Sequence, residues 1–146
     1  MERNNRPKVG VAVLVERDGK VLLHRRKGEH GLGTWSVAGG HVEYGETPEE
    51  CAIREVWEEV GITITKVAFM GITNDVFAET GRHYVTIWMH ATAMEGDGYA
   101  RAENEVEDVQ WFPRDALPEP LFLPVYNLLN GGLYASADTA WIQPRP

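Results

Sequence analysis

The sequence predicts an α+β protein in which two helices pack on a mixed β-sheet. The chain has 146 residues, which suits one domain over 1–146 with a core of about 8–130 and a tail at 131–146. Six segments have the patterns of strands and two have helical patterns, in the order β-β-β-α-β-β-β-α.

The first strands are indicated by apolar, β-branched runs. Residues 9–16 suit a buried strand, and the Asp18-Gly19 turn connects them to residues 21–25 as a hairpin. Residues 27–34, which hold three glycines, predict a loop. A short strand at 35–38 then ends in Gly39-Gly40, and residues 41–46 predict a tight turn.

The first helix has clear start and stop signals. Thr47 suits the N-cap, Pro48 suits the first helical position, and Glu50 completes a capping box. The apolar periodicity runs to Val60, and Gly61 is suited to the C-terminal cap.

The second half of the chain predicts three further strands and a short helix. Residues 62–69 and 71–77 suit a strand, residues 82–94 alternate, residues 106–112 suit a strand, and residues 121–129 suit a helix. In the alternating segment, Val85, Ile87, Met89 and Ala91 face one way and Tyr84, Thr86, Trp88 and His90 the other. Residues 131–146 have a weak pattern, and we expect a partly mobile tail.

The net charge of −8 argues against binding to a nucleic-acid backbone. The acidic excess lies in two short segments. Residues 41–62 carry −6, residues 101–108 carry −3, and the other 116 residues sum to +1. An acidic surface that only kept the protein soluble would be spread more evenly.

Other classes of protein are excluded by what the sequence lacks. It has no apolar stretch of eighteen residues and no apolar segment near its start, so we expect neither a membrane span nor a secretory signal. The single Cys51 excludes an internal disulfide framework, which favours a cytoplasmic location.

A helical wheel over residues 51–60 separates two faces. The expected core stripe comprises Ala52, Ile53, Val56, Trp57 and Val60. Glu55, Glu58 and Glu59 share another arc, with Arg54 beside Glu58, and their spacing brings the three carboxylates together.

Neighbouring like charges destabilise a helix, and no lysines are interleaved here to offset them. Two interpretations remain open, a solvated acidic face and a site for a hard divalent cation. Mg²⁺ and Mn²⁺ prefer carboxylate and carbonyl oxygens. Glycine lacks a Cβ and reaches unusual φ and ψ angles, so Gly39-Gly40 lets the backbone approach closely, and the Gly40 carbonyl is a candidate further ligand.

From Gly40 through Glu46 to the Arg-Glu-Val-Trp-Glu-Glu-Val-Gly-Ile run at 54–62, the sequence matches every fixed position of the Nudix box. The chain therefore resembles the Nudix hydrolases. The resemblance implies the Nudix fold, an α/β/α sandwich around a mixed, twisted β-sheet. It also implies hydrolysis, with Mg²⁺ or Mn²⁺, of a nucleoside diphosphate linked to another moiety.

The resemblance also implies roles for individual residues. Glu55, Glu58, Glu59 and the Gly40 carbonyl would bind metal, Arg54 would orient the glutamates, and Glu46 would brace the loop. A metal-activated water would attack phosphorus, with Glu59 or an acid of the second acidic segment as general base. In that segment Glu105 is favoured over Glu103 and Glu107, and a solvated turn is the alternative interpretation.

Substrate contacts are expected from one base and several aromatic residues. Arg26 would contact the phosphates. Tyr84, Trp88 and Trp35 could stack on a base, although such residues more often lie in a core or a dimer contact. The histidines at 24, 41, 83 and 90 lack the spacing of zinc ligands.

Within the family, the segments at 39–46, 74–77, 83–87 and 117–124 resemble the MutT-like nucleoside triphosphate diphosphatases. This implies conversion of a (d)NTP, including modified or oxidised forms, to the monophosphate and pyrophosphate by a homodimer. Two alternatives stay open. One is a diphosphatase for a nucleotide sugar or prenyl diphosphate, and the other is a non-catalytic nucleotide-sensing domain.

Overall fold

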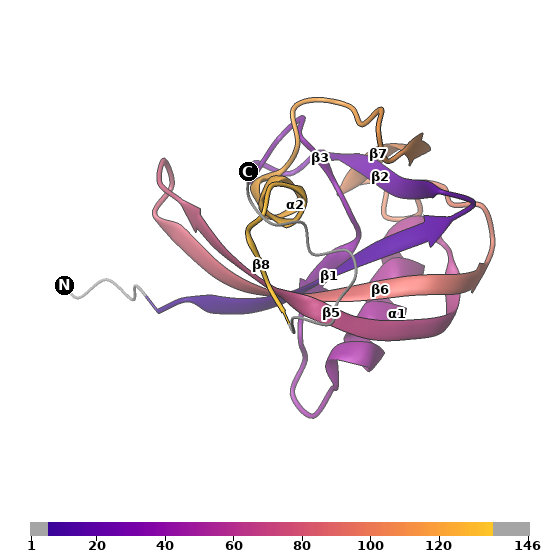
Figure 1. The fold of residues 1–146 in the computed structure, drawn as a ribbon, viewed down its shortest axis with the longest axis horizontal. Helices are drawn as coiled ribbons and strands as arrows, with labels where there is room; N and C mark the ends of the chain where they lie inside the picture. Colours follow the sequence, from indigo (N-terminus) through magenta and orange to yellow (C-terminus); the bar gives the residue numbers. More distant parts are fainter. Residues whose placement is uncertain (1–5, 136–146) are drawn as a thin grey trace.

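The structure is a computed structural model that describes residues 6–135, and within them the chain forms eight strands and two helices (Figure 1). In chain order these elements are β1 (Lys8–Arg17), β2 (Lys20–Arg26), β3 (Trp35–Ser36), β4 (Gly39–His41), α1 (Pro48–Val60), β5 (Thr63–Phe77), β6 (Arg82–Glu95), β7 (Val106–Pro113), α2 (Leu123–Leu129) and β8 (Leu133–Tyr134).

The strands form one mixed sheet in the order β3-β2-β1-β6-β5-β8, with β4 paired to β1 and β7 paired to β2. Strands β1 and β6 run parallel, whereas the other pairs between named strands are antiparallel. The hairpin predicted at residues 9–25 is confirmed, and β1 and β2 pair only next to its turn, at Glu16–Val21 and Arg17–Lys20. Beyond the turn the two strands separate, and β4 pairs with β1 instead.

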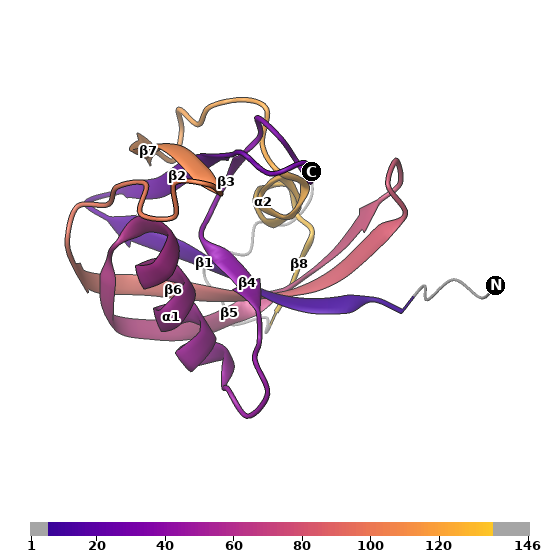
Figure 2. The ribbon, with the colours of Figure 1, turned by 180° about the vertical axis from the view of Figure 1, so that it is seen from behind.

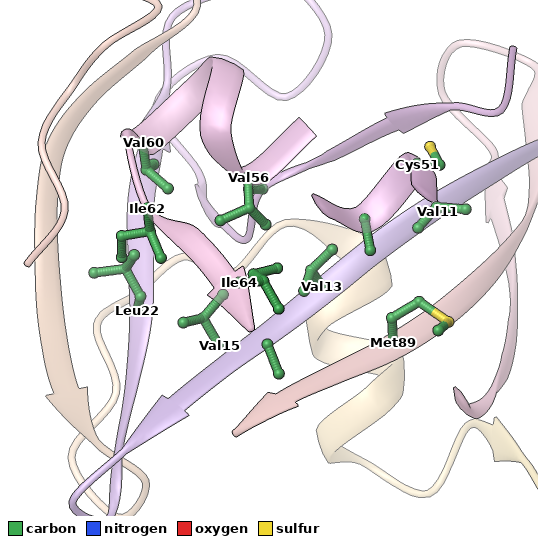
Figure 3. Close-up of a cluster of buried hydrophobic side chains, with 13 residues drawn as sticks. Val11, Val13, Val15, Leu22, Cys51, Val56, Val60, Ile62, Ile64 and Met89 are labelled. Atoms are coloured by element: carbon green, nitrogen blue, oxygen red, sulfur yellow. The ribbon is translucent and has the colours of Figure 1, made fainter. Parts of the chain in front are cut away.

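The two helices lie on opposite faces of this sheet (Figures 1 and 2), as expected for an α/β/α sandwich. Strand β1 is buried on both faces. Val11, Val13 and Val15 pack into the cluster under α1 (Figure 3), whereas Ala12 and Leu14 pack into the cluster under α2. The apolar run predicted to be a buried strand therefore supplies both cores.

Helix α1 begins and ends as its sequence predicts. The Thr47 hydroxyl accepts the Glu50 N–H at 3.1 Å, and the Glu50 carboxylate accepts the Thr47 N–H at 2.9 Å. Gly61 closes the helix in the left-handed conformation with φ 69°. These contacts satisfy backbone groups that the helix itself leaves unpaired.

The buried face of α1 is rotated from the predicted one. Ile53 and Trp57 were expected in the core but are 41% and 45% exposed, whereas Cys51 is fully buried. The helical period places Glu55 and Glu59 between Cys51 and Ala52, so this rotation turns both carboxylates toward the sheet.

Shorter elements account for the remaining differences. Strand β5 is continuous over the two predicted segments, with a register shift between Phe69 and Gly71. Helix α2 begins at Leu123, two residues later than predicted. Strands β4 and β8 have only three and two residues, too few to show a period in the sequence.

Residues 136–146 of the predicted tail lie outside the described residues. Neither helix within residues 6–135 is long and apolar enough to cross a membrane.

Candidate active site

Strand β4 holds two glycines directly beneath the carboxylates of α1. The Gly39 N–H donates to Glu59 Oε1 at 3.2 Å. A Cβ added to Gly40 would lie 2.5 Å from Glu55 Oε1, and one added to Gly39 would overlap the Val11 carbonyl oxygen. Neither glycine has a positive φ. Glycine is thus required here by close approach, and not by the unusual backbone angles considered from the sequence.

The two glutamates that face β4, Glu55 and Glu59, are largely desolvated. Burial raises the pKa of Glu59 well above its usual range, and the nearby Glu55 and Glu105 carboxylates raise it further. Burial also raises the pKa of Glu55, although its ion pair with Arg54 opposes that shift. Desolvated, adjacent carboxylates are costly unless a proton or cation accompanies them.

Arg54 connects α1 to the loop that precedes it. Its guanidinium lies 2.7 Å from Glu46 Oε2, 2.7 Å from Glu55 Oε1 and 3.3 Å from Glu58 Oε2. Glu46 also accepts the Glu43 N–H at 3.0 Å, which closes the turn before the helix. These contacts have the geometry that an orienting arginine and a bracing glutamate require, and the two roles stay predictions.

Glu58 is arranged differently from its two neighbours. Its side chain is about half exposed and contacts Arg54, whereas Glu55 and Glu59 lie against β4. Within residues 6–135 no three acidic, histidine or cysteine side chains are grouped so that they could hold a metal ion as they stand. The sequence predicted that all three carboxylates converge; the structure places Glu55 and Glu59 against β4, and Glu58 shares the Arg54 Nη1 contact with Glu55.

The second acidic segment docks beside this site through its backbone. The Lys27 N–H donates to the Glu105 carbonyl at 3.1 Å, and Lys27 Nζ donates to the Glu103 carbonyl at 2.7 Å. The negative charge of Glu105 raises the pKa of both Glu59 and Arg26. Glu107 lies on β7 opposite Arg25. Glu105 therefore lies close enough for its charge to act on Glu59.

A pocket of about 170 Å³ opens on the other side of β4. Aromatic rings form part of its wall. Tyr84 stacks between His30 and His41 at centroid distances of 6.0 and 5.9 Å, and Phe77 lies 5.4 Å from Phe122. The lining also includes the polar residues Ser36, Thr86 and Arg26, together with Gly39 and Gly40.

Arg26 lies between the pocket and the acidic residues. Its Nε donates to the His30 carbonyl at 2.8 Å, and its guanidinium carbon lies 4.0 Å from the centre of the Phe122 ring. Burial lowers its pKa from the usual arginine value, whereas the charges of Glu59 and Glu105 raise it. Besides Nε, the Arg26 guanidinium has two terminal nitrogens that can donate hydrogen bonds.

The structure corrects the expectation for Trp88. Its side chain is fully buried in the cluster beneath α2, and its indole N–H donates to the Thr73 hydroxyl at 2.9 Å. Trp88 and Tyr84 share a face of β6, but α2 covers that face at Trp88. Trp35 packs edge-on against Phe112 in the same cluster. Neither tryptophan lines the pocket.

Sequence reasoning missed four aromatic residues of the pocket, His30, His41, Phe77 and Phe122. They come from a loop, the end of β4, the end of β5 and the residue before α2, so no common period links them. The strand pattern offered a signal for Phe77, because β5 pairs it with Arg82 beside Tyr84.

Comparisons with known proteins agree with this fold. The NUDIX domain family model matches residues 4–129. An NAD-capped RNA hydrolase, NudC, of Pseudomonas aeruginosa is 40% identical over 73% of this chain and 36% of its own length. An oxidized purine nucleoside triphosphate hydrolase of Danio rerio is 38% identical over 73% of this chain and 66% of its own.

Among solved structures, the MutT NUDIX hydrolase from Burkholderia pseudomallei is similar, with a TM-score of 0.76 and 33% identity over 80% of this chain and 90% of that one. The sandwich in which the carboxylate-bearing helix α1 lies beside strand β4, with its two glycines, defines the class of protein. The chain belongs to the NUDIX family. It spans 36% and 41% of the length of two NudC proteins that it matches, those of Pseudomonas aeruginosa and Chromobacterium violaceum.

Proposed function

We propose that this chain hydrolyses the phosphoric anhydride of a nucleoside triphosphate, including modified or oxidised forms, to the monophosphate and pyrophosphate. The observation that carries the proposal is the position of Arg26. It lies between an aromatic pocket and a buried pair of carboxylates, and its terminal nitrogens suit bidentate contact with a phosphate. A nucleotide has the matching order of parts, a planar base and then a polyanionic chain.

The residues present fit a divalent cation. Glu55 and Glu59 are desolvated and adjacent, and Gly40 has no Cβ that would separate its backbone from Glu55. We assign Glu55, Glu58, Glu59 and the Gly40 carbonyl as its ligands, which requires Glu58 to turn from Arg54. A bound Mg²⁺ or Mn²⁺ would offset the charge of the diphosphate and make water a better nucleophile.

The residues around the proposed metal site would take the proton, hold the phosphates and contact the base. Glu105 accepts the proton of the attacking water, and Glu59 is the alternative base. The water oxygen forms a bond to phosphorus as the anhydride P–O bond breaks and pyrophosphate leaves. Arg26 holds the phosphates, and Tyr84, with Phe77 and Phe122, packs on the base.

The relatives support an anhydride substrate but differ in which one they name. One named relative acts on oxidized purine nucleoside triphosphates, another on NAD-capped RNA, and a third is an ADP-ribose pyrophosphatase. A linked diphosphate, such as a nucleotide sugar or a prenyl diphosphate, is therefore the second candidate. A non-catalytic sensor is the third, and the presence of every box glutamate weighs against it.

A substrate panel with Mg²⁺ and identification of the phosphate products tests the proposal. Monophosphate plus pyrophosphate supports the triphosphate reaction, whereas two monophosphates from a dinucleotide or nucleotide sugar support the second candidate. Nucleotide-dependent thermal stabilisation without turnover supports the sensor. If no nucleoside diphosphate derivative or prenyl diphosphate is cleaved and Glu59→Gln behaves as the parent protein does, the enzyme proposal is wrong.

We also propose a homodimer in a reducing, cytoplasmic setting, which suits the free and buried Cys51. Sedimentation at several concentrations tests the oligomeric state, and a mass of about twice 16.4 kDa is expected.

A further inference from the structure

The exposure of Trp57 has a structural explanation in the segment after β6. Trp57 is one of the residues expected in the core, yet it is 45% exposed, and the guanidinium carbon of Arg101 lies 4.9 Å from the centre of its ring. The two residues are 44 positions apart in the sequence. A cation over an indole face is an attractive contact, so Arg101 and Trp57 stabilise each other's position.

Residues 99–102 close the C-terminal end of α1. The Tyr99 N–H donates to the Val60 carbonyl at 3.0 Å, and the N–H groups of Arg101 and Ala102 both donate to the Glu59 carbonyl at 3.0 and 3.2 Å. Arg101 Nη1 adds a contact with the Glu58 carbonyl at 3.3 Å. These are carbonyls that a helix end leaves without an internal partner.

Arg101 also supplies charge that α1 lacks. The last turn of α1 has no basic residue of its own. A cation at a helix C-terminus interacts favourably with the helix dipole. Arg101 therefore contributes a hydrogen bond, a ring contact and a favourable charge at one place.

The same segment leads directly to the acid assigned as base. The N–H groups of Glu105 and Val106 both donate to the Ala102 carbonyl, at 2.9 and 3.0 Å. Residues 102–106 thus form a tight turn whose start is attached to the carbonyl of Glu59. The position of Glu105 relative to the Glu59 side chain depends on that attachment, together with the Lys27 N–H directly after β2, which donates to the Glu105 carbonyl.

We propose that Arg101 and Trp57 are positioning residues whose contact holds the Glu105 turn against the end of α1 and fixes the distance between Glu105 and Glu59. This inference rests on the proposed function, in which Glu105 takes the proton of the attacking water.

Steady-state kinetics on the substrate found by the panel test the proposal. Arg101→Ala and Trp57→Ala should each lower kcat about tenfold, because small displacements of a catalytic group cost that much or more. KM should stay the same, since neither residue lines the pocket. Arg101→Lys and Trp57→Phe keep a cation and a ring, and should recover most of kcat.

Ile53→Ala is the matched control. Ile53 lies one turn earlier on α1 and is 41% exposed, but no cation stacks on it, so its kcat should equal that of the parent protein. Glu105→Gln provides the second background. There Arg101→Ala should lower kcat no further, whereas general damage to the fold would lower it again.

Amide hydrogen exchange keeps the test decisive if Glu105→Gln is too slow to measure. In Arg101→Ala, the amides of residues 99–106 should exchange faster than in the parent protein while those of β1 and β6 do not change. Faster exchange with unchanged kcat overturns the proposal, and so does a lower kcat with unchanged exchange. Failure of the parent protein to cleave any substrate is a different result and refutes the proposed function.

Discussion

At the residue scale, Glu59 shows how one side chain is fitted to a charged partner. One of its oxygens accepts the Gly39 N–H, while burial and two neighbouring carboxylates disfavour its ionised form. A group used only for solubility would lie in water, where none of these costs arise. The crowding is thus consistent with a site that is completed by a cation.

Replacing Glu59 by Gln tests that interpretation. We expect activity to fall by about 10²–10⁴-fold, because the change removes a proposed metal ligand and alternative base. Without divalent cations the variant should be at least as stable as the parent, since a neutral amide relieves repulsion with Glu55. Activity assays and urea unfolding in chelator measure the two effects. A strong loss of stability in chelator would show that Glu59 is mainly structural.

The same carboxylate leads to an expected pH dependence of turnover. The pKa values of Glu55 and Glu59 are raised, so a rising pH ionises the groups that bind the cation and can accept a proton. We expect kcat/KM with Mg²⁺ to rise toward alkaline pH. Rate measurements from acid to alkaline pH check this, and a maximum in acid would contradict the mechanism.

His24 should make stability depend on pH independently of the site carboxylates. Burial, with a contribution from the Arg26 charge, lowers its pKa to about 3. Below about pH 6.5 the unfolded chain therefore binds a proton on His24, whereas the native state keeps His24 neutral. The contribution of His24 to the free energy of unfolding should be fully present above that pH. It should fall as the pH decreases from 6.5 toward 3, with a loss of about 2 kcal/mol at pH 5.

Urea unfolding at pH 7.5 and pH 5 measures this effect. His24→Gln should be less sensitive to pH than the parent by that amount, while the control His83→Gln should keep the parent's pH dependence. Equal pH dependence in all three proteins would show that His24 is not buried in its neutral form.

At the scale of elements, β4 and α1 form the site as a pair. The strand has three residues, two of them glycine, and the helix is rotated so that Glu55 and Glu59 meet its backbone. That rotation leaves Ile53 and Trp57 in solvent, and Trp57 then contacts Arg101. The rotation of α1 on the sheet therefore both forms the carboxylate site and exposes Trp57 to the segment that leads to Glu105.

The two glycines of β4 should respond differently to substitution. In Gly39→Ala the Cβ meets the backbone carbonyl of Val11, so β4 must separate from β1, and we expect a loss of about 1–3 kcal/mol in stability. In Gly40→Ala the Cβ meets the Glu55 carboxylate, a side chain that can move, so activity should fall with a smaller loss of stability. Urea unfolding and kcat/KM separate the two outcomes. Equal losses of stability would mean that the Glu55 side chain cannot move away from the added Cβ.

At the scale of the whole molecule, the acidic excess behind the net charge of −8 is concentrated in two segments, residues 41–62 and 101–108. The two acidic segments lie far apart in the sequence, and the contacts of residues 101 and 102 with Glu59 bring them together at one end of α1. A polyanionic substrate would be repelled from this region unless cations accompany it. The charge distribution thus implies that cation binding and stability are linked.

Divalent cations should therefore stabilise the whole protein. At about one hundred times its dissociation constant, Mg²⁺ or Mn²⁺ should add about 2.7 kcal/mol. Thermal unfolding in chelator and in increasing Mg²⁺ measures the effect, with Glu55→Gln/Glu59→Gln as the control that should lose it. A melting temperature that stays constant up to millimolar cation would contradict the interpretation of the charge.

The sequence by itself determined the local features of this protein. Thr47, Glu50 and Gly61 define the ends of α1 because caps depend on neighbouring residues, and the spacing of Gly40, Glu46 and the 54–62 run identified the family. Strand β1 was predictable because burial on both faces demands a continuous apolar run.

Only the tertiary structure decided which face of α1 is buried and which aromatic residues line the pocket. The wheel gives angles around the helix but not its rotation on the sheet, so it placed Ile53 and Trp57 in the core and set Glu55 and Glu59 apart from it. The alternation of β6 gave Tyr84 and Trp88 the same face, and α2 covers only the second. Both features depend on long-range packing, because residues distant in the sequence cover these faces of α1 and β6.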